Sequence, residues 1–365
     1  MNFKNPIRMA CTRALITVSF LSLLLASSCQ KDSELTPSDA AGTSAVRPEV
    51  STKGPVKLAT TTQTFLGVPI TSSSVISLYK KSNVTISGLT ISGGSAPCIQ
   101  LTQCTNVHIT KCKLQNTTNY GILIGSGCSN ILIDSCYISN VATGVLAVTC
   151  PDGQIRINAN QFLNMKGPFP KGSYIQFSGV GGRYNRIQNN ICENTQGYSN
   201  PEDGISIYKS NGIAGDPICV VSNTLRGGGP STTGSGITVG DGGGSYIFAA
   251  YNTVVNSGYM GMQVAGGHDV QLYANNITSS AFSWSHQGLG CGNYSGQSSY
   301  NITINGNKVK WISGKSSDQI RGSKSIERDA SYQVGTSMPG GWTSNILGAG
   351  ISPTSVVPST LITWQ

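Results

Sequence analysis

Hydrophobic and polar positions repeat along this chain in short segments that read glycine, apolar, any residue, apolar. The spacings between successive segments are 23, 30, 30, 32, 25 and 27 residues. The segments begin at Gly121, Gly144, Tyr174, Gly204, Gly236, Gly261 and Gly288. Alternating apolar positions are typical of a β-strand, and a fixed unit with variable insertions indicates a repeat architecture. Stacked strands would place equivalent residues of successive repeats side by side.

A second column of residues follows the same period. It consists of Cys112, Cys136, Asn160, Asn190, Asn223, Asn252, Asn275 and Asn307. Asparagine tolerates left-handed backbone geometry and can bond its neighbours in a bend, and stacked asparagines can satisfy one another as a ladder. We therefore predict asparagines that point into the bends, one strand separation apart, with the two cysteines as small buried hydrophobic residues.

Two strand columns in a minimal repeat of 24 residues describe a parallel β-helix. The consensus of a leucine-rich repeat is absent, and a propeller would need four strands in a longer repeat. From about residue 70 to 320 the repeats resemble the right-handed β-helix, or pectin-lyase-like, family. We predict an all-β protein with a single right-handed parallel β-helix of about 8–10 coils over residues 55–325. Residues 326–365 would form a capping segment, in which Ile346 has no strand column to join.

The N-terminus predicts export. Lys4, Arg8 and Arg13 precede the apolar run 15–26, which is too short to span a bilayer but suits a signal peptide. The small residues before Cys29 resemble a bacterial lipoprotein cleavage site, with ordinary secretion as the alternative. We predict a lipoprotein signal peptide over residues 1–28, lipidation of Cys29 and a flexible tether over residues 29–54. The protein would then lie at the outer membrane or cell surface, attached to the membrane through the lipid only.

Net charge and cysteine content indicate which kinds of binding partner to expect. Removal of residues 1–28 takes away three basic residues and lowers the net charge from +9 to +6. A mild positive balance suits a polyanionic substrate, although it also serves solubility. No run of lysine and arginine indicates nucleic-acid binding. Nine cysteines remain without metal-ligand spacing, and an odd, unclustered set argues against a disulfide framework. We expect a monomer.

Candidate chemistry gathers between residues 180 and 294. Lys209 lies five residues after Gly204, and Asp241 lies five residues after Gly236, so the two should occupy the same place on neighbouring coils. His268 follows at the same end, one coil further on. Each of these could instead be a turn residue or a surface charge. Tyr208, Tyr259, Trp284 and Gln263 are candidates for sugar binding, through aromatic rings or an outward polar side chain.

The resemblance implies cleavage of an acidic polysaccharide by β-elimination. It casts Lys209 as the base, Arg226 or His268 as its partner, and Glu202, Asp203 and Asp241 as candidate ligands of Ca²⁺. A lysine base must lose its proton, so the pKa of Lys209 would have to fall.

Two other functions remain open on the same fold. One is a glycoside hydrolase that uses Asp203 and Asp241 as paired carboxylates. The other is a non-catalytic glycan binder or adhesin.

Overall fold

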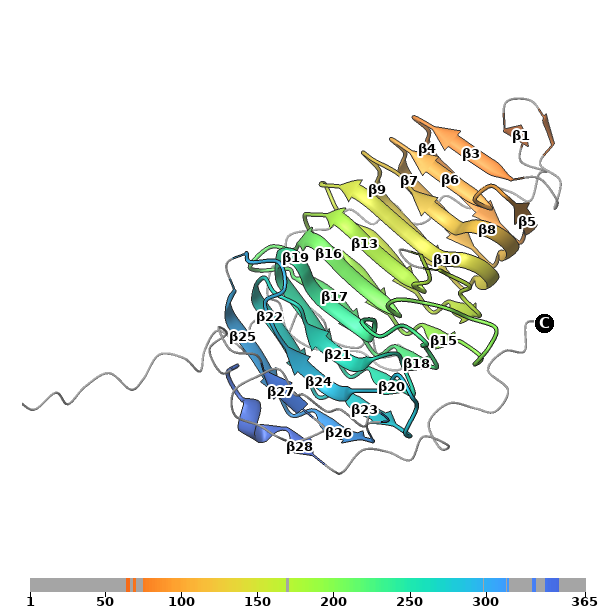
Figure 1. Ribbon diagram of the computed structural model, residues 1–365. Helices are drawn as coiled ribbons and strands as arrows, with labels where there is room; N and C mark the ends of the chain where they lie inside the picture. Colours follow the sequence, from red (N-terminus) through yellow and green to blue (C-terminus); the bar gives the residue numbers. More distant parts are fainter. Residues whose placement is uncertain are drawn as a thin grey trace, which may run out of the picture.

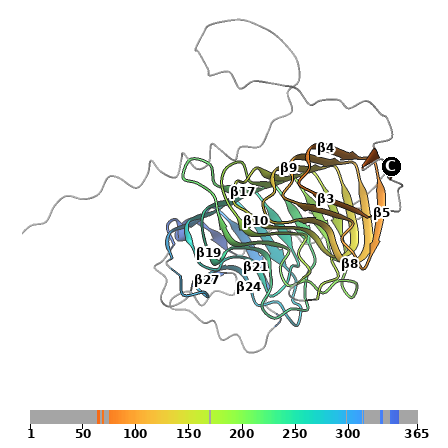
Figure 2. The same cartoon turned by 90° about the horizontal axis from the view of Figure 1, so that it is seen from above.

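The computed structural model is a stack of coils, each built from three short strands that pair in parallel with the strands of the next coil (Figures 1 and 2). It describes residues 64–65, 68–69, 75–168, 171–297, 299–312, 314, 330–332 and 339–347. The one helical element among these residues is the 3₁₀ turn η1 (Trp342–Ser344). No helix in this part of the chain is long and apolar enough to cross a membrane.

The parallel ladders form three faces, which we call sheets 1, 2 and 3. Sheet 1 contains β3 (Ile76–Tyr79), β6 (Ile99–Thr102), the ends of β8 (Lys113–Ile124) and β10 (Tyr137–Cys150), β13 (Ile175–Val180), β16 (Ile205–Asn211), the start of β19 (Ser235–Ala250), β21 (Met260–Val264), β24 (Gln287–Cys291) and β27 (Ala330–Tyr332). Sheet 2 contains β4 (Ser82–Ser87), β7 (Thr105–Thr110), β9 (Ser129–Asp134), β11 (Ile155–Asn158), β14 (Arg186–Gln188), β17 (Ile218–Val221), the end of β19, β22 (His268–Tyr273) and β25 (Tyr300–Asn305).

Sheet 3 contains β5 (Thr90–Gly94), the starts of β8 and β10, β12 (Gln161–Leu163), β15 (Ile191–Glu193), β18 (Thr224–Arg226), β20 (Thr253–Val255), β23 (Asn276–Ser279), β26 (Lys308–Trp311) and β28 (Ile346–Leu347). Outside these sheets, β1 (Thr64–Phe65) and β2 (Val68–Pro69) pair antiparallel.

The described strands make nine complete coils and part of a tenth, in agreement with the predicted number. Three details differ from the expectation. Each coil has a third strand, in sheet 3, that the two sequence columns did not predict. β27 and β28 continue sheets 1 and 3 beyond residue 325, the predicted end of the solenoid. Ile346 therefore does join a strand column, contrary to the prediction.

The segments of sheet 1 begin with glycine because the packed interior leaves no room there for a Cβ atom. A Cβ atom on Gly204 would lie 2.9 Å from Cδ2 of Leu225, and one on Gly236 would lie 2.5 Å from Cγ1 of Val254. Both neighbours are buried residues of sheet 3. Tyr174 is the exception in this column: its side chain is fully buried, and its hydroxyl donates to the carbonyl of Arg226 at 3.1 Å. The glycine column therefore lies where side chains of sheet 3 leave no room for a Cβ atom on sheet 1.

The asparagine column forms the predicted ladder. Asn190, Asn223 and Asn252 have no exposed surface, and Nδ2 of Asn190 donates to Oδ1 of Asn223 at 2.9 Å. Each side chain also donates to a main-chain carbonyl, as Asn223 does to Ile187 at 2.9 Å. The left-handed residue of each bend is the one before the asparagine, such as Ser222 with φ of 56°. The asparagine thus satisfies buried backbone groups, while its neighbour makes the turn.

Eight of the described cysteines are free and buried, as predicted, whereas Cys219 is disulfide-bonded. Cys112 and Cys136 are buried in the asparagine column, and the other free thiols are buried as well. These free cysteines are Cys98, Cys104, Cys112, Cys128, Cys136, Cys150, Cys192 and Cys291.

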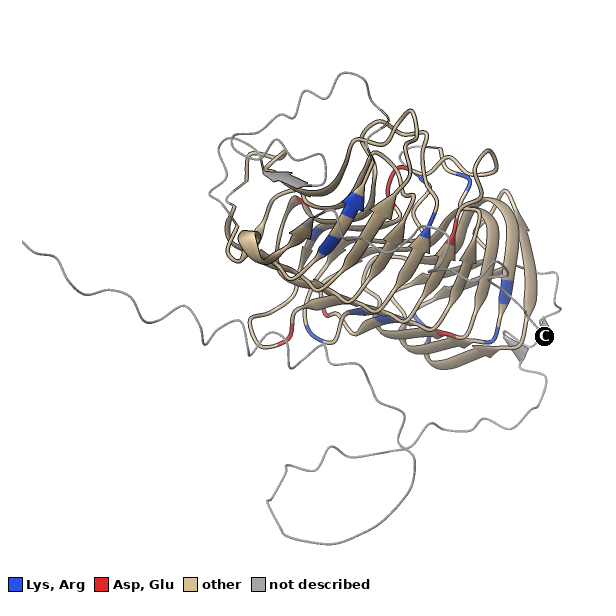
Figure 3. Ribbon diagram, turned by 90° about the horizontal axis from the view of Figure 1, so that it is seen from below, with Lys and Arg blue, Asp and Glu red and all other residues tan. Residues whose placement is uncertain are grey.

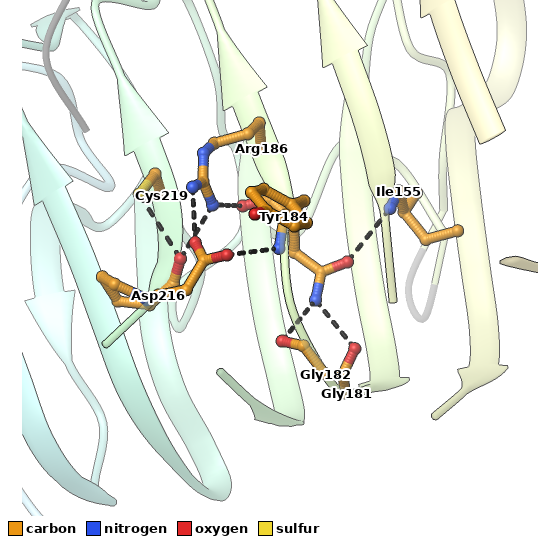
Figure 4. A network of polar contacts seen from close by, with 9 residues as sticks. Ile155, Gly181, Gly182, Tyr184, Arg186, Asp216 and Cys219 are labelled. Carbon is orange, nitrogen blue, oxygen red and sulfur yellow. Dashed lines mark hydrogen bonds and ion pairs between the residues drawn. The ribbon is translucent and has the colours of Figure 1, made fainter. Parts of the chain in front are cut away.

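A polar network fixes the corner between sheets 1 and 2 (Figure 4). Asn185 is fully buried; its Oδ1 accepts from the Ile155 amide at 3.1 Å, and its Nδ2 donates to the Gly181 carbonyl at 2.8 Å. Arg186 pairs with Asp216, whose second carboxylate oxygen accepts from a backbone amide. Because these bonds join three successive coils, they hold the corner in register beside the strands that carry the candidate site.

Candidate functional site

Asp203 is the most perturbed carboxyl group on the outer face of sheet 1. It immediately precedes the glycine that leads into β16, and its Oδ1 accepts from the Ser235 amide at 2.8 Å and from Oγ1 of Thr238 at 2.8 Å. Burial raises the pKa of Asp203 to about 7, against the lowering effect of these two bonds. The nearby carboxyl groups of Glu202 and Asp241 contribute to the same rise. Asp203 can therefore carry a proton near neutral pH, although its side chain keeps some exposure to solvent.

A line of hydrogen bonds connects Asp203 across three coils. Thr238 donates to Asp203 and accepts from Nε2 of Gln263 at 3.3 Å. The strand register pairs Ser206 with Thr238 and Thr238 with Gln263, so these residues form one outward row on β16, β19 and β21. Thr238 holds the carboxyl group in place, a role that the sequence did not indicate. Gln263, predicted to bind substrate, is almost fully buried and orients Thr238.

Asp241 and Lys209 lie at the other end of the same strands. The equal spacing from glycine predicted that they would face each other, but a bulge in β19 places Asp241 opposite Tyr208, one residue earlier. Burial raises the pKa of Asp241, while the Gly242 amide and Lys209 lower it. Asp241 also contributes to the raised pKa of Asp203, so the two carboxyl groups interact electrostatically.

Lys209 is fully solvent-exposed, with its Nζ 5.0 Å from the centre of the Tyr208 ring. Its hydrogen bond with Tyr208 and the charge of Asp241 raise its pKa. This direction is opposite to the one that a lysine base requires. Lys209 is therefore a cation beside a carboxylate and an aromatic ring.

Glu202 points to the adjoining loop. Its two carboxylate oxygens accept from the hydroxyls of Ser231 and Thr233, with 2.6 Å to Ser231. These bonds engage both carboxylate oxygens of Glu202, and those on Asp203 engage its Oδ1, among the oxygens that were predicted to bind Ca²⁺. Within the ranges that the structure describes, no group of three or more histidine, cysteine, aspartate or glutamate side chains is arranged to hold a metal ion.

Arg226 lies on a different face from Lys209. It ends β18 in sheet 3, where its guanidinium pairs with Glu193 on the preceding coil, with 2.6 Å from Nε to Oε1. The structure does not bring Arg226 to the outer face of sheet 1. Its position in the sequence, just before a glycine-rich loop that leads to β19, had suggested otherwise.

His268 starts β22 on sheet 2, past the corner that Gly266 and Gly267 form. Its Nδ1 lies 2.7 Å from Oδ2 of Asp269, and its ring stacks on Tyr300 with centroids 4.6 Å apart. Its register partner on β19 is Ser245, four residues beyond Asp241. His268 therefore belongs to an aromatic cluster on sheet 2 rather than to the row that contains Asp203.

Two of the predicted sugar-binding aromatics have one face covered by another ring. Tyr259 stacks on His286 with centroids 4.6 Å apart, and Trp284 stacks on Phe282 at 5.0 Å. The Trp284 indole also lies where a Cβ on Gly229 would be. These rings pack the loops that border sheet 1 near Asp203. Tyr208 lies beside the charged groups, since Lys209 Nζ is 5.0 Å from its ring and Asp241 is its register partner.

Charged residues are otherwise sparse on the solenoid. Figure 3 shows lysine, arginine, aspartate and glutamate scattered over separate coils, with most of the ribbon carrying neither sign. Asp203, Asp241 and Lys209 therefore stand out as interacting charges on two adjacent coils of one face.

Comparison with known proteins supports the β-helix fold. Residues 74–250 match the family model described as a right handed beta helix region. Together with the three parallel ladders, this match shows a right-handed parallel β-helix. A search of curated proteins found no match to the chain.

Proposed function

We propose that this right-handed β-helix protein is a carbohydrate-active enzyme that cleaves an acidic polysaccharide on the outer face of sheet 1. The observation that carries the proposal is Asp203, whose pKa is raised to about 7 by burial and by the carboxyl groups of Glu202 and Asp241. Acid–base catalysis is most efficient when the pKa of the catalytic group is close to the working pH.

Hydrolysis of a glycosidic bond is the reaction that this arrangement supports best. Asp203, in its protonated form, would donate a proton to the oxygen of the leaving sugar. Asp241, in its ionised form, would act as the base that activates water or as the nucleophile. Two carboxyl groups with different protonation states are the usual requirement for this chemistry. Lys209 would bind a carboxylate of the substrate, because it is exposed and remains charged.

β-Elimination is the second candidate, and the charged Lys209 favours it. This reaction removes a proton next to a uronate carboxylate, so a cation must neutralise that carboxylate. Lys209 would supply the cation and Asp203 the acid for the leaving oxygen. The raised pKa of Lys209 assigns it to this partner role instead of the base, which leaves Asp241 to remove the proton. A non-catalytic glycan binder would use the same residues without turnover.

The deciding experiment is an activity screen of the purified protein against uronic-acid and neutral polysaccharides. Hydrolysis gives new reducing ends alone, whereas elimination also gives an unsaturated product that absorbs ultraviolet light. Asp203→Asn should lower kcat by about 100-fold or more, while Asp269→Asn, a carboxylate on sheet 2, should not. The rate should fall as pH rises above about 7, because Asp203 must be protonated. Binding without cleavage of any polysaccharide would leave the binder as the function.

The proposal also includes a cellular location for the protein and Ca²⁺ as a cofactor. Lipidation at Cys29, with residues 29–54 as a tether, would hold the β-helix at the outer membrane or cell surface as a monomer. These residues lie outside those that the structure describes. Ca²⁺, held by Asp203 or Asp241, would neutralise a substrate carboxylate, and adding a chelator to the activity assay tests this directly.

A further inference from the structure

We propose that Tyr120 and Lys171 form a second carboxylate-binding subsite for the same polysaccharide, three coils before Asp203. The inference rests on the proposed function, because it names where the substrate extends beyond the reacting bond. Neither residue was a candidate from the sequence.

The strand register places Tyr120 in the same row as Asp203. Tyr120 pairs with Thr143. Ile122, Val145, Ile175 and Ile205 pair in succession along sheet 1. Tyr120, Thr143, Ser173 and Asp203 each lie two residues before one of these. Three strand separations, about 14 Å, therefore divide Tyr120 from Asp203 along one edge of the sheet.

Lys171 and Tyr120 provide the chemistry of a uronate subsite. The Lys171 Nζ lies 5.2 Å from the centre of the Tyr120 ring, and both side chains are partly exposed. A cation held over an aromatic ring offers a charge for a carboxylate and a flat apolar surface for a sugar ring. The loop that carries Lys171 is fixed to the sheet, since the Gly172 amide donates to Oγ1 of Thr143 at 2.9 Å.

The outward row beside this pair changes from polar to apolar. On the coils of Asp203 and its neighbours the row holds Ser206 and Thr238, but on the coils of Tyr120 and Thr143 it holds Leu123 and Leu146. Leu123 lies between Ile122 and Ile124, whose side chains fill the core, so it points outward. Leu123 is partly exposed and extends the apolar surface beside Tyr120 on which a sugar ring can pack, whereas Leu146 is almost fully buried.

The separation fits an extended polysaccharide. A sugar unit of about 5 Å matches the strand spacing, so each unit would lie over one coil. A chain with one unit at Asp203 would place another at Tyr120 and Lys171 after about three units. Substrates shorter than this could not occupy both places, so the subsite should act only on longer oligosaccharides.

The test measures binding of galacturonate dimer and hexamer to the full-length Asp203→Asn protein by calorimetry, so that turnover does not interfere. Adding Lys171→Met should weaken hexamer binding roughly fivefold and leave dimer binding unchanged. Lys113→Met is the matched control, because Lys113 lies over Tyr137 at 5.8 Å on sheet 3. This control should change neither affinity. A xylose hexamer tests the charge, since Lys171→Met should not affect a neutral chain.

The outcomes separate the subsite from the proposed function. Unchanged hexamer binding in Lys171→Met would overturn the subsite, even where the wild-type protein cleaves the polymer. An equal loss with the xylose hexamer would overturn carboxylate recognition. A hexamer affinity that depends on Lys171, in a protein that cleaves nothing, would support the subsite and refute catalysis. Failure of every uronate chain to bind would overturn both.

Discussion

Replacing Asp203 by asparagine should stabilise the folded protein at neutral pH. Both hydrogen bonds to this residue, from Ser235 and Thr238, reach the same oxygen, Oδ1. An asparagine can keep its amide oxygen at that position and accept both bonds. The substitution therefore removes an ionisable group from a place that disfavours its charge, without removing a bond that holds the strand edge.

The magnitude follows from the raised pKa. The ordinary value is 3.8 and the folded-state value is about 7. Between these values the folded protein keeps a proton that the unfolded chain has lost, so its stability falls as pH rises. The loss is absent below the ordinary pKa and complete above about pH 7. Three pKa units correspond to about 4 kcal/mol at most, and the partial exposure of Asp203 makes this an upper limit.

Urea unfolding of both proteins at several pH values measures the effect. The advantage of Asp203→Asn should grow from near zero at about pH 4 to its full value at about pH 8. Asp134→Asn is the control of opposite sign, because bonds from His108 and Thr110 lower the pKa of Asp134 despite its burial. That variant should lose stability above the ordinary pKa. An advantage of Asp203→Asn that does not vary with pH would refute the reasoning.

Three further outcomes are expected. Asn223→Leu should destabilise the fold by about 3 kcal/mol in denaturant unfolding, because it leaves buried donors and acceptors unpaired, whereas Gln188→Leu on the outer face of β14 should change stability little. Gly204→Ala should lower the melting temperature by several degrees, since its Cβ would overlap the next coil, while Gly215→Ala meets nothing within 4 Å and should be tolerated. Cys29→Ser should move the protein from the membrane fraction to the soluble fraction, and retention would point to a protein partner instead.

Two of the three sheets could be predicted from residue spacing because their sequence patterns span several residues in each coil. The glycine segments mark sheet 1, and the apolar residues three before each asparagine mark sheet 2. Sheet 3 was not predicted because its strands are short. β12, β15 and β18, for example, each have three residues and one buried side chain. Those side chains, Phe162, Cys192 and Leu225, each lie two residues after a ladder asparagine. The sequence therefore contains a signal for sheet 3, but a single apolar residue in each coil shows no alternation from which a strand could be predicted.

The candidate site was predictable only where it depends on strand register. Equal spacing from glycine indicated that Lys209 and Asp241 lie on adjacent coils, although the bulge in β19 shifted the pairing by one residue. Arg226 and His268 were misplaced because a three-sided coil turns them onto other faces. The raised pKa of Asp203 could not be predicted, since it arises from packing around the carboxyl group.

The asparagine ladder gives the solenoid a chemical direction. Each ladder asparagine donates through its backbone amide and Nδ2 to the oxygen of the asparagine on the next coil, and the series ends with Asn307 donating to Asn345. At the opposite end of the ladder, the backbone amide of Cys136 donates to Oδ1 of Asn160. Cys112 and Cys136, which occupy the column on the earlier coils, have no side-chain amide that needs an acceptor. The two ends are therefore not equivalent. A chain cut before Asn345 would expose unpaired donors and fray coil by coil from that end, so residues 339–347 close a one-way hydrogen-bonded chain.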